Sequence, residues 1–422
     1  MPLALPGLHA PRIQQLANGA RVVSLDLPEA PLVCLDFWCR AGSVFEAPGE
    51  SGLAHFLEHM VFKGSASLEP GEFDRRIEAL GGSSNAATGF DDVHYHVLIP
   101  PQDAPEALDL LLDLVLEPRL EARAFELERQ VVLEELAQSE DQPEEVALQR
   151  LLSAGCPGHP YGRPILGQRS ALLDQTPELM AGFHRRHYTA ERCLLTLSGC
   201  LDPEAAHTIA LQEHLAVSRL AQLGGEDAEP PLPPVAVRPG EQRLQLPRLE
   251  SARLLMLWAL PPASDLHGVM GADLLTSLLA EGRRSRLVER LREQLRLVES
   301  IDLDLHVLEG GSVALLEAIA EPEDLPAIRR EIETVLAELG DGPVPVPEWE
   351  RARRLVANGY RFGLESAAGV AGVLSSTHLW NHPAALDAPL LELDRWDPQT
   401  LVNEILPLLA PQRACLLEAV PA

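Results

Sequence analysis

The chain has 422 residues, a length that suggests about two to four domains. With 46% hydrophobic and 23% charged residues, it has the composition of a globular protein that can bury sizeable cores. Its 34 basic and 63 acidic residues give a net charge of −29, which argues against nucleic acid or an anionic membrane as the main partner. A basic peptide or protein would suit this charge better, although acidity that only keeps the protein in solution is the simpler explanation.

Cysteine usage and the N-terminal residues bear on the cellular compartment. The six cysteines are scattered without CxxC spacing, so neither a disulfide framework nor a zinc ribbon is predicted. The opening residues lack a basic stretch ahead of an apolar one, and no apolar run reaches the ~18 residues of a membrane span. We therefore expect a cytoplasmic protein with reduced thiols.

The first half of the chain alternates strand-like and helical patterns. The expected order is strand, strand, helix, strand and amphipathic helix, over 21–26, 32–39, 53–62, 93–99 and 104–116. A second helix follows and opens with Glu126-Leu127-Glu128-Arg129.

A proline-rich segment, GGEDAEPPLPPVAVRPG over 224–240, divides the chain into halves of about equal size. Because proline cannot continue a helix or pair within a sheet, we expect a semi-extended linker between a domain over 1–223 and a domain over 241–422.

The second half repeats the layout of the first. Its expected strands and helices lie at 243–246, 253–260, 272–279, 313–319 and 325–339, and Glu348-Trp349-Glu350-Arg351 opens the next helix. The offset between the halves is roughly 220 residues, well beyond the period of solenoid repeats. We infer an α+β fold of two homologous domains, each a mixed sheet with helices, that arose by duplication.

The strongest local motif is His55-Phe56-Leu57-Glu58-His59 in a helical stretch. Residues four apart share one helix face, so His55 and His59 can present both imidazoles to one metal ion. Glu58 lies on nearly the same face and can act on a water molecule without occupying a coordination position. This HxxEH order is the inverse of HExxH.

Zinc needs a third protein ligand and one open position. The acidic helix over 121–138 offers Glu128 and Glu135, which are two turns apart on one face, with Glu134 and Glu140 as competitors. A solvated helix face is the simpler explanation for most of these glutamates.

Other histidines are weaker candidates. His94 and His96 lie two apart on an expected strand and therefore on one face, where they could ligate a metal, but packing or substrate lining is the favoured interpretation. His184 and His187 have no carboxylate partner in a motif and are interpreted as structural. The chain contains neither a phosphate-binding glycine loop nor a GxSxG elbow.

Four segments together resemble one protein family. They are GLAHFLEHM with FKG over 52–64, GGSSNAAT over 81–88, ERQVVLEE over 128–135 and HPYGRPILG over 159–167. In this set and order, the chain resembles the M16 (pitrilysin or insulinase-like) metallopeptidases, most closely the short-chain M16B branch that contains the mitochondrial processing peptidase β subunit.

The resemblance implies a zinc metalloendopeptidase that hydrolyses unfolded or short peptides. One Zn²⁺ per chain would be held by His55, His59 and Glu135, with Glu58 moving the proton from water to the leaving amine. Glu128 matches a second carboxylate that the family keeps near the metal, where it would orient a ligand histidine or tune the charge.

The second half has lost the metal motif. Its expected helix over 272–279 has no histidine, and the place of Glu135 falls near Ala357. The family closes a chamber with four such domains, so a chain with two implies a dimer. The family's Arg-x6-Tyr pair is incomplete, because Arg292 is present but Glu299 stands where the tyrosine should be.

We therefore predict a heterodimer whose inactive M16-type partner carries the arginine and tyrosine, with a homodimer as the alternative. Substrate peptides are expected to add a strand to an exposed edge near 84–93, which includes Asn85 and Ala86, while Arg292 would also bind substrate. The rival functions are a scaffold subunit without turnover, a general peptide-degrading enzyme and a dedicated maturation protease for one precursor.

Overall fold

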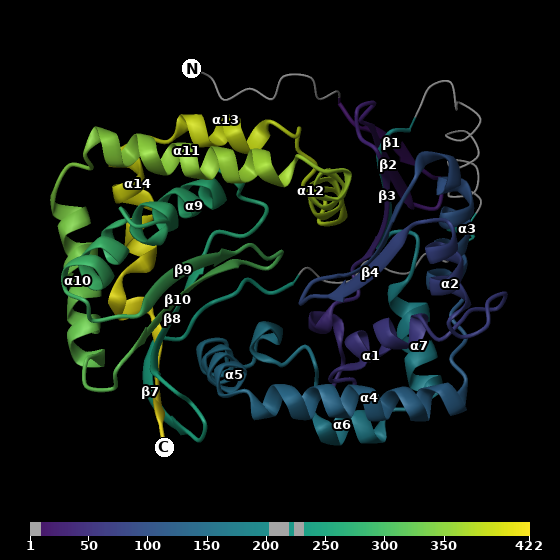
Figure 1. Cartoon of the computed structure of the whole chain (residues 1–422), viewed down its shortest axis with the longest axis horizontal. Helices are drawn as coiled ribbons and strands as arrows, with labels where there is room; N and C mark the ends of the chain where they lie inside the picture. Colours follow the sequence, from purple (N-terminus) through teal and green to yellow (C-terminus); the bar gives the residue numbers. More distant parts are fainter. Residues whose placement is uncertain (1–9, 202–218, 223–231) are drawn as a thin grey trace.

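A computed structural model describes residues 10–201, 219–222 and 232–422 of the chain. It contains two mixed β-sheets that lie side by side, each with helices packed around it (Figure 1). This arrangement confirms the expected α+β class with two similar halves. Residues 224–231 of the predicted linker lie outside the described residues, and the proposed domain boundaries stay a prediction.

The first sheet has six strands in the order β1-β2-β6-β3-β5-β4. Its strands are β1 (Arg12–Gln15), β2 (Arg21–Asp26), β3 (Val33–Cys39), β4 (Ser83–Thr88), β5 (Val93–Ile99) and β6 (Cys193–Gly199). The pair β2–β6 is parallel and the other pairs are antiparallel. Strand β4 therefore forms an outer edge.

The second sheet has five strands in the order β7-β11-β8-β10-β9. Its strands are β7 (Gly240–Leu246), β8 (Ala252–Leu260), β9 (Ser300–His306), β10 (Ser312–Ala320) and β11 (Cys415–Pro421). With β1 set aside, both sheets place their strands in the order first, fifth, second, fourth, third, and in both the first and fifth strands are parallel. The shared topology supports the duplication that the sequence predicts.

The helices follow the same division. The described helices of the first half are α1 (Leu53–Val61), α2 (Glu72–Ala79), α3 (Ala104–Leu116), α4 (Ala122–Asp141), α5 (Pro143–Gly155), α6 (Arg169–Asp174) and α7 (Pro177–His187). Those of the second half are α9 (Leu266–Ala280), α10 (Leu325–Asp341), α11 (Val346–Gly363), α12 (Ala367–Leu379), α13 (Ala388–Arg395) and α14 (Pro398–Glu404). None of these described helices is long and apolar enough to cross a membrane.

One helix of each half packs on the sheet of the other half. Helix α5 packs on β8 and β11 of the second sheet, where Leu151 joins a cluster with Leu257. Helix α12 packs on β3 and β6 of the first sheet, and Ser375 donates a hydrogen bond to Thr196 at 2.8 Å. The two halves are thus held together by buried apolar contacts in both directions.

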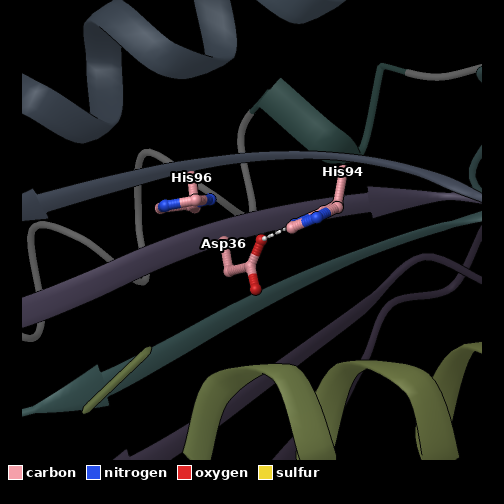
Figure 2. A group of neighbouring side chains, drawn as sticks. All are labelled: Asp36, His94 and His96. Atoms are coloured by element: carbon pink, nitrogen blue, oxygen red, sulfur yellow. Dashed lines mark hydrogen bonds and ion pairs between the residues drawn. The ribbon is translucent and has the colours of Figure 1, made fainter. Parts of the chain in front are cut away.

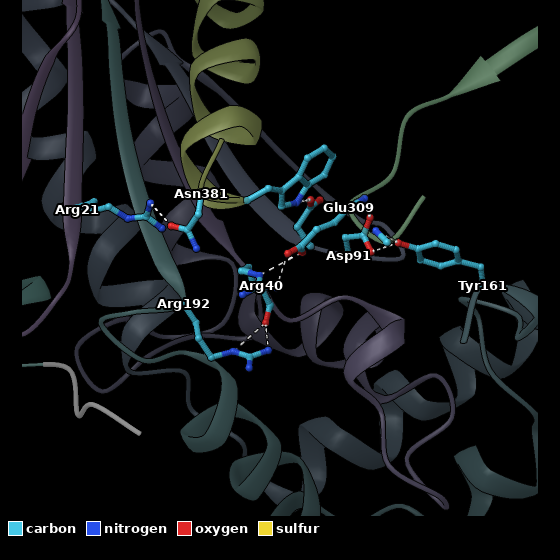
Figure 3. A network of polar contacts seen from close by, with 10 residues as sticks. Arg21, Arg40, Asp91, Tyr161, Arg192, Glu309 and Asn381 are labelled. Carbon is cyan, nitrogen blue, oxygen red and sulfur yellow. Dashed lines mark hydrogen bonds and ion pairs between the residues drawn. The ribbon is translucent and has the colours of Figure 1, made fainter. Parts of the chain in front are cut away.

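A polar network also joins the halves (Figure 3). The hydroxyl of Tyr161 donates to Asp91 Oδ1 at 2.7 Å and accepts from the backbone N–H of Gly310 at 2.9 Å. The backbone N–H of Glu309 donates to the other oxygen of Asp91 at 2.8 Å, and the guanidinium of Arg40 pairs with the carboxylate of Glu309. Asp91 lies in the turn between β4 and β5, so the network fixes this turn to the second half.

Candidate metal centre

Helix α1 carries the HxxEH motif on a firmly held backbone. It begins after Gly52, whose φ of +84° places that residue in the left-handed region, and seven of its nine residues are buried. The carboxylate of Glu46 accepts hydrogen bonds from the backbone N–H groups of Gly52 at 3.1 Å and Ala54 at 3.0 Å. These are N–H groups of the first turn, which have no partner within the helix.

No motif points to Glu46, since an acidic residue seven positions ahead of a helix is a weak signal. Burial raises the pKa of Glu46 to about 8, against the opposing effect of its two backbone hydrogen bonds. Arg163 donates to the backbone carbonyl of Glu46 at 3.1 Å, so the HPYGRPILG segment also supports the start of α1.

The predicted ligands converge. Nε2 of His55 lies 3.7 Å from Oε1 of Glu135, and Nε2 of His59 lies 3.4 Å from Oε2 of the same carboxylate. The two imidazoles come from adjacent turns of α1 and Glu135 comes from α4, and one donor atom of each lies within 4.8 Å of the others. The two competing glutamates are not part of this group. Glu134 is exposed, and Glu140 lines a groove beside the site.

The donor set fits zinc. Two imidazole nitrogens and one carboxylate oxygen form a common three-residue set for catalytic Zn²⁺. Burial and the nearby His59 lower the pKa of His55 to about 4, so this imidazole is neutral at pH 7 and offers a lone pair. Its Nδ1 is buried and has no hydrogen-bond partner in the part of the chain that the structure describes.

Glu128 orients His59. Its Oε1 lies 3.0 Å from Nδ1 of His59 and its Oε2 lies 2.8 Å from Nζ of Lys63. Burial would raise the pKa of Glu128, but the hydrogen bonds from His59 and Lys63 outweigh it and hold the pKa below its usual value. An ionised Glu128 accepts a hydrogen bond from the N–H at Nδ1 of His59, which leaves the Nε2 lone pair of His59 for a metal.

Glu58 lies beside the three ligands but outside their set. The hydroxyl of Thr88, on β4, donates a hydrogen bond to its Oε2. Burial raises the pKa of Glu58, while the Thr88 hydrogen bond and the charge of His59 oppose the shift. Thr88 therefore positions the carboxyl group of Glu58. It ends the GGSSNAAT segment, but no role was predicted for it from the sequence.

A groove of about 910 Å³ opens beside His55 and Glu58. Its apolar lining includes Leu136, Val146 and Leu166, and Glu140 and Glu145 add negative charge. These residues come from α4, α5 and the segment that follows Tyr161, and the edge strand β4 borders the groove.

The predicted substrate residues lie in different places. Ala86 lines the groove, whereas Asn85 is exposed on β4 and, by strand alternation, faces the other side of the sheet. Arg292 lies in the π-helical turn η4 (Val288–Gln294) of the second half, where it pairs with Glu293 at 2.8 Å. Arg292 is not among the residues that line this groove.

Two family models match the chain, and related sequences are known. The insulinase (peptidase family M16) model matches residues 21–169, and the model of the M16 inactive domain matches 174–356. An uncharacterized zinc protease of Mycobacterium leprae is 29% identical over 83% of this chain and 78% of its own. The mitochondrial-processing peptidase subunit beta of Lentinula edodes is 33% identical over 47% of this chain and 42% of its own.

Solved structures share the fold. A protease from Helicobacter pylori superposes with a TM-score of 0.88 at 23% identity, over 97% of this chain and 99% of that one. A peptidase M16 inactive domain from Pseudomonas fluorescens gives a TM-score of 0.87 at 20% identity, over 98% of each chain.

Proposed function

Because this chain belongs to the M16 family of metallopeptidases, we propose that it is a zinc-dependent endopeptidase that cleaves unfolded or short peptides as the catalytic subunit of a heterodimer. The observation that carries the peptidase proposal is the convergence of His55, His59 and Glu135, with Glu58 beside them and held by Thr88. Zinc held by these three ligands would polarise the scissile carbonyl and acidify water.

The chain's own residues supply the proton transfers. Glu58 takes a proton from the attacking water as the new C–O bond forms, and gives it to the amine nitrogen as the C–N bond breaks. Its raised pKa makes Glu58 a better acceptor and a still competent donor near neutral pH. Thr88 keeps one oxygen of Glu58 fixed, so the other oxygen is free to face water.

The outer edge of β4 suits an extended peptide. No strand of the described residues pairs with this edge, so its backbone N–H and C=O groups can bond a substrate strand, which selects for an extended conformation over a particular sequence. The apolar side chains of the groove would take the substrate's side chains, and Glu140 and Glu145 favour basic residues among them.

The test is cleavage of a quenched basic peptide by the purified, zinc-loaded chain. Glu58→Gln should lower kcat by about 10²-fold or more because the proton acceptor is lost, without lowering zinc content. Glu134→Gln, an exposed neighbour of the ligand Glu135, is the matched control and should keep full activity. Equal turnover by Glu58→Gln and the unaltered chain would refute the proposal.

The heterodimer proposal rests on the second half. Arg292 pairs with its neighbour Glu293, and Glu299, which stands in place of the pattern's tyrosine, accepts a hydrogen bond from Ser251 at 3.2 Å. A carboxylate cannot donate a hydrogen bond to a peptide carbonyl as a phenol does. We expect the chain alone to bind zinc but turn over slowly until a partner with the Arg/Tyr pair is added.

Light scattering and peptidase assays on the chain alone test this proposal. If the chain alone forms a homodimer with full turnover, the heterodimer proposal is wrong and the chain is a homodimeric peptidase. A chain that binds zinc and stays inactive with every M16-type partner from the same cell would favour the scaffold alternative.

A further inference from the structure

We propose that Asp36, His94 and His96 form a second site for a zinc-like divalent metal ion, on the face of the first sheet opposite α1. Side chains alternate along β5, and Tyr95 packs in the core with the α1 residue Phe56. His94 and His96 therefore point to the other face, and with Asp36 they form a group of possible ligands separate from His55, His59 and Glu135, although the charge of Glu58 on α1 still acts on His94.

The strand register brings the three residues together. Asp36 on β3 lies directly opposite His96 on β5, and His94 is two residues away on the same face. One donor atom from each lies within 4.8 Å of the others. Figure 2 shows the three side chains and the contact between Nδ1 of His94 and Oδ1 of Asp36, at 3.3 Å.

The two imidazoles are held nearly parallel. Their ring centroids are 5.6 Å apart with an angle of 16° between the planes, and His94 also packs against the indole of Trp38 at 4.6 Å. A histidine clamped by an aromatic ring and a carboxylate has few alternative rotamers, so little ordering would be needed to bind an ion.

Burial makes a positive charge favourable here. Asp36 is only 3% exposed, and among the described residues its sole ion-pair partner is His94. A buried carboxylate needs a compensating charge or hydrogen bonds, which a dication between Asp36 and the two imidazoles would supply. The side chain of His94 is 24% exposed, so solvent and ions have access.

The donor types select the metal. Two imidazole nitrogens and one carboxylate oxygen suit Zn²⁺ and related first-row dications, whereas Ca²⁺ and Mg²⁺ prefer oxygen ligands. An ion bound by all three residues would cross-link β3 to β5, one strand inside the edge strand β4. Helix α12 bounds the site on one side, since Ala371 packs on Cys34 of the same sheet face.

The experiment removes the first site and measures metal at the second. The double variant His55→Gln/His59→Gln is stripped with a chelator, dialysed against Zn²⁺ and analysed for bound zinc. We expect about one ion per chain, lost when His96→Gln is added, and a thermal midpoint that rises with zinc only while His96 is present. His306→Gln, at the exposed end of β9, is the matched control and should leave binding unchanged.

The readouts do not depend on peptidase activity, so the failure of one proposal is distinguishable from the failure of the other. No zinc on the double variant, or equal zinc with and without His96, would overturn the site. The closeness of His94 and Asp36 would then be explained by a hydrogen bond between the two side chains. Should the His96 variant fail to fold, Co²⁺ added to the double variant decides: the intense visible d–d bands of four-coordinate Co²⁺ support the site, and only the weak band of hydrated Co²⁺ refutes it.

Discussion

At the scale of single residues, two glycines let the metal helix start where it does. Gly52 and Gly167 have φ values of +84° and +81° and their backbones touch. A Cβ on Gly167 would lie 2.5 Å from the Cα of Gly52 and from the carbonyl oxygen of Ser51. The segment that follows Tyr161 can therefore support α1 only with glycine at this crossing.

We predict that Gly167→Ala lowers the free energy of unfolding by about 2 kcal/mol or more and weakens zinc binding, because strain and overpacking add. Gly49→Ala is the matched control, since Gly49 also has a positive φ of +91° but a Cβ there meets nothing within 4 Å. Denaturant unfolding and zinc titration of both variants check this. Equal effects would contradict a role for the backbone contact.

Arg296 is a non-glycine residue in the left-handed region, with a φ of +55°, and is therefore under backbone strain. Arg296→Gly should stabilise the chain by roughly 0.5–1 kcal/mol, because glycine adopts this conformation without a steric penalty. Gln294→Gly, within the preceding π-helical turn, should destabilise it by about 1 kcal/mol. The thermal midpoints of the two variants are compared with that of the unaltered chain. A loss of stability in both variants would argue against backbone strain at Arg296.

At the scale of elements, α7 carries histidines that are kept neutral by burial. His187 is 4% exposed between Phe45 and Phe183, and burial, aided by Arg192 and Arg186, lowers its pKa to about 3. Burial likewise lowers the pKa of His184 to about 4, although its hydrogen bond to the carbonyl of Val115 opposes the shift. Both side chains act as core residues, as expected from the sequence.

These shifts predict a loss of stability in acid. Below the unfolded-state pKa of about 6.5 the unfolded chain binds a proton at each histidine, and the folded chain does not until the pH nears its depressed pKa. Stability is therefore full above about pH 6.5 and falls as the pH drops toward 4.

The variant His187→Phe tests this. Between pH 7.5 and pH 5, the unaltered chain should lose about 2 kcal/mol more of its free energy of unfolding than this variant does, as measured by urea unfolding. His306→Gln, at an exposed position, should not change the slope. A slope unchanged by His187→Phe would show that this imidazole does not account for the acid sensitivity.

At the scale of the whole molecule, the two halves are joined by exchanged helices and by the network around Asp91. Tyr161 is central, since its hydroxyl binds Asp91 of the first half and the backbone of Gly310 in the second. Burial raises the pKa of Asp91, and its hydrogen bonds from Glu309 and Tyr161 oppose the shift. Losing Tyr161's hydroxyl leaves a buried carboxyl oxygen without this donor.

We predict that Tyr161→Phe lowers the free energy of interaction between the two halves by about 1–3 kcal/mol. The unfolding of the two halves should then separate into distinct calorimetric transitions. Tyr360→Phe is the control, because among the described residues the Tyr360 hydroxyl bonds only to the carbonyl of Leu386 in the same half, at 2.7 Å. If both variants lower one common transition by the same amount, the network does not couple the halves.

Much of the fold follows from local pattern. The strands at 21–26 and 93–99 and the helix at 104–116 lie where their periodicity predicts, because apolar spacing at period two or 3.6 needs only a sheet or a helix to bury it. Helix α9 is longer than expected and β1 was not predicted, since α9 is apolar on nearly all sides and β1 is short and mostly exposed. The exchange of α5 and α12 has no local signal at all.

The sequence by itself determined the family and the candidate metal ligands on α1, because residues four apart share a helix face in any fold. It could not choose among the glutamates of α4 without the family resemblance, since that choice depends on how two helices pack. Only the tertiary structure decided that Glu46 caps α1, that Thr88 holds Glu58 and that Asp36 joins His94 and His96. Each of these contacts joins residues whose separation along the chain carries no periodic signal, so the packing of the whole chain brings them within reach.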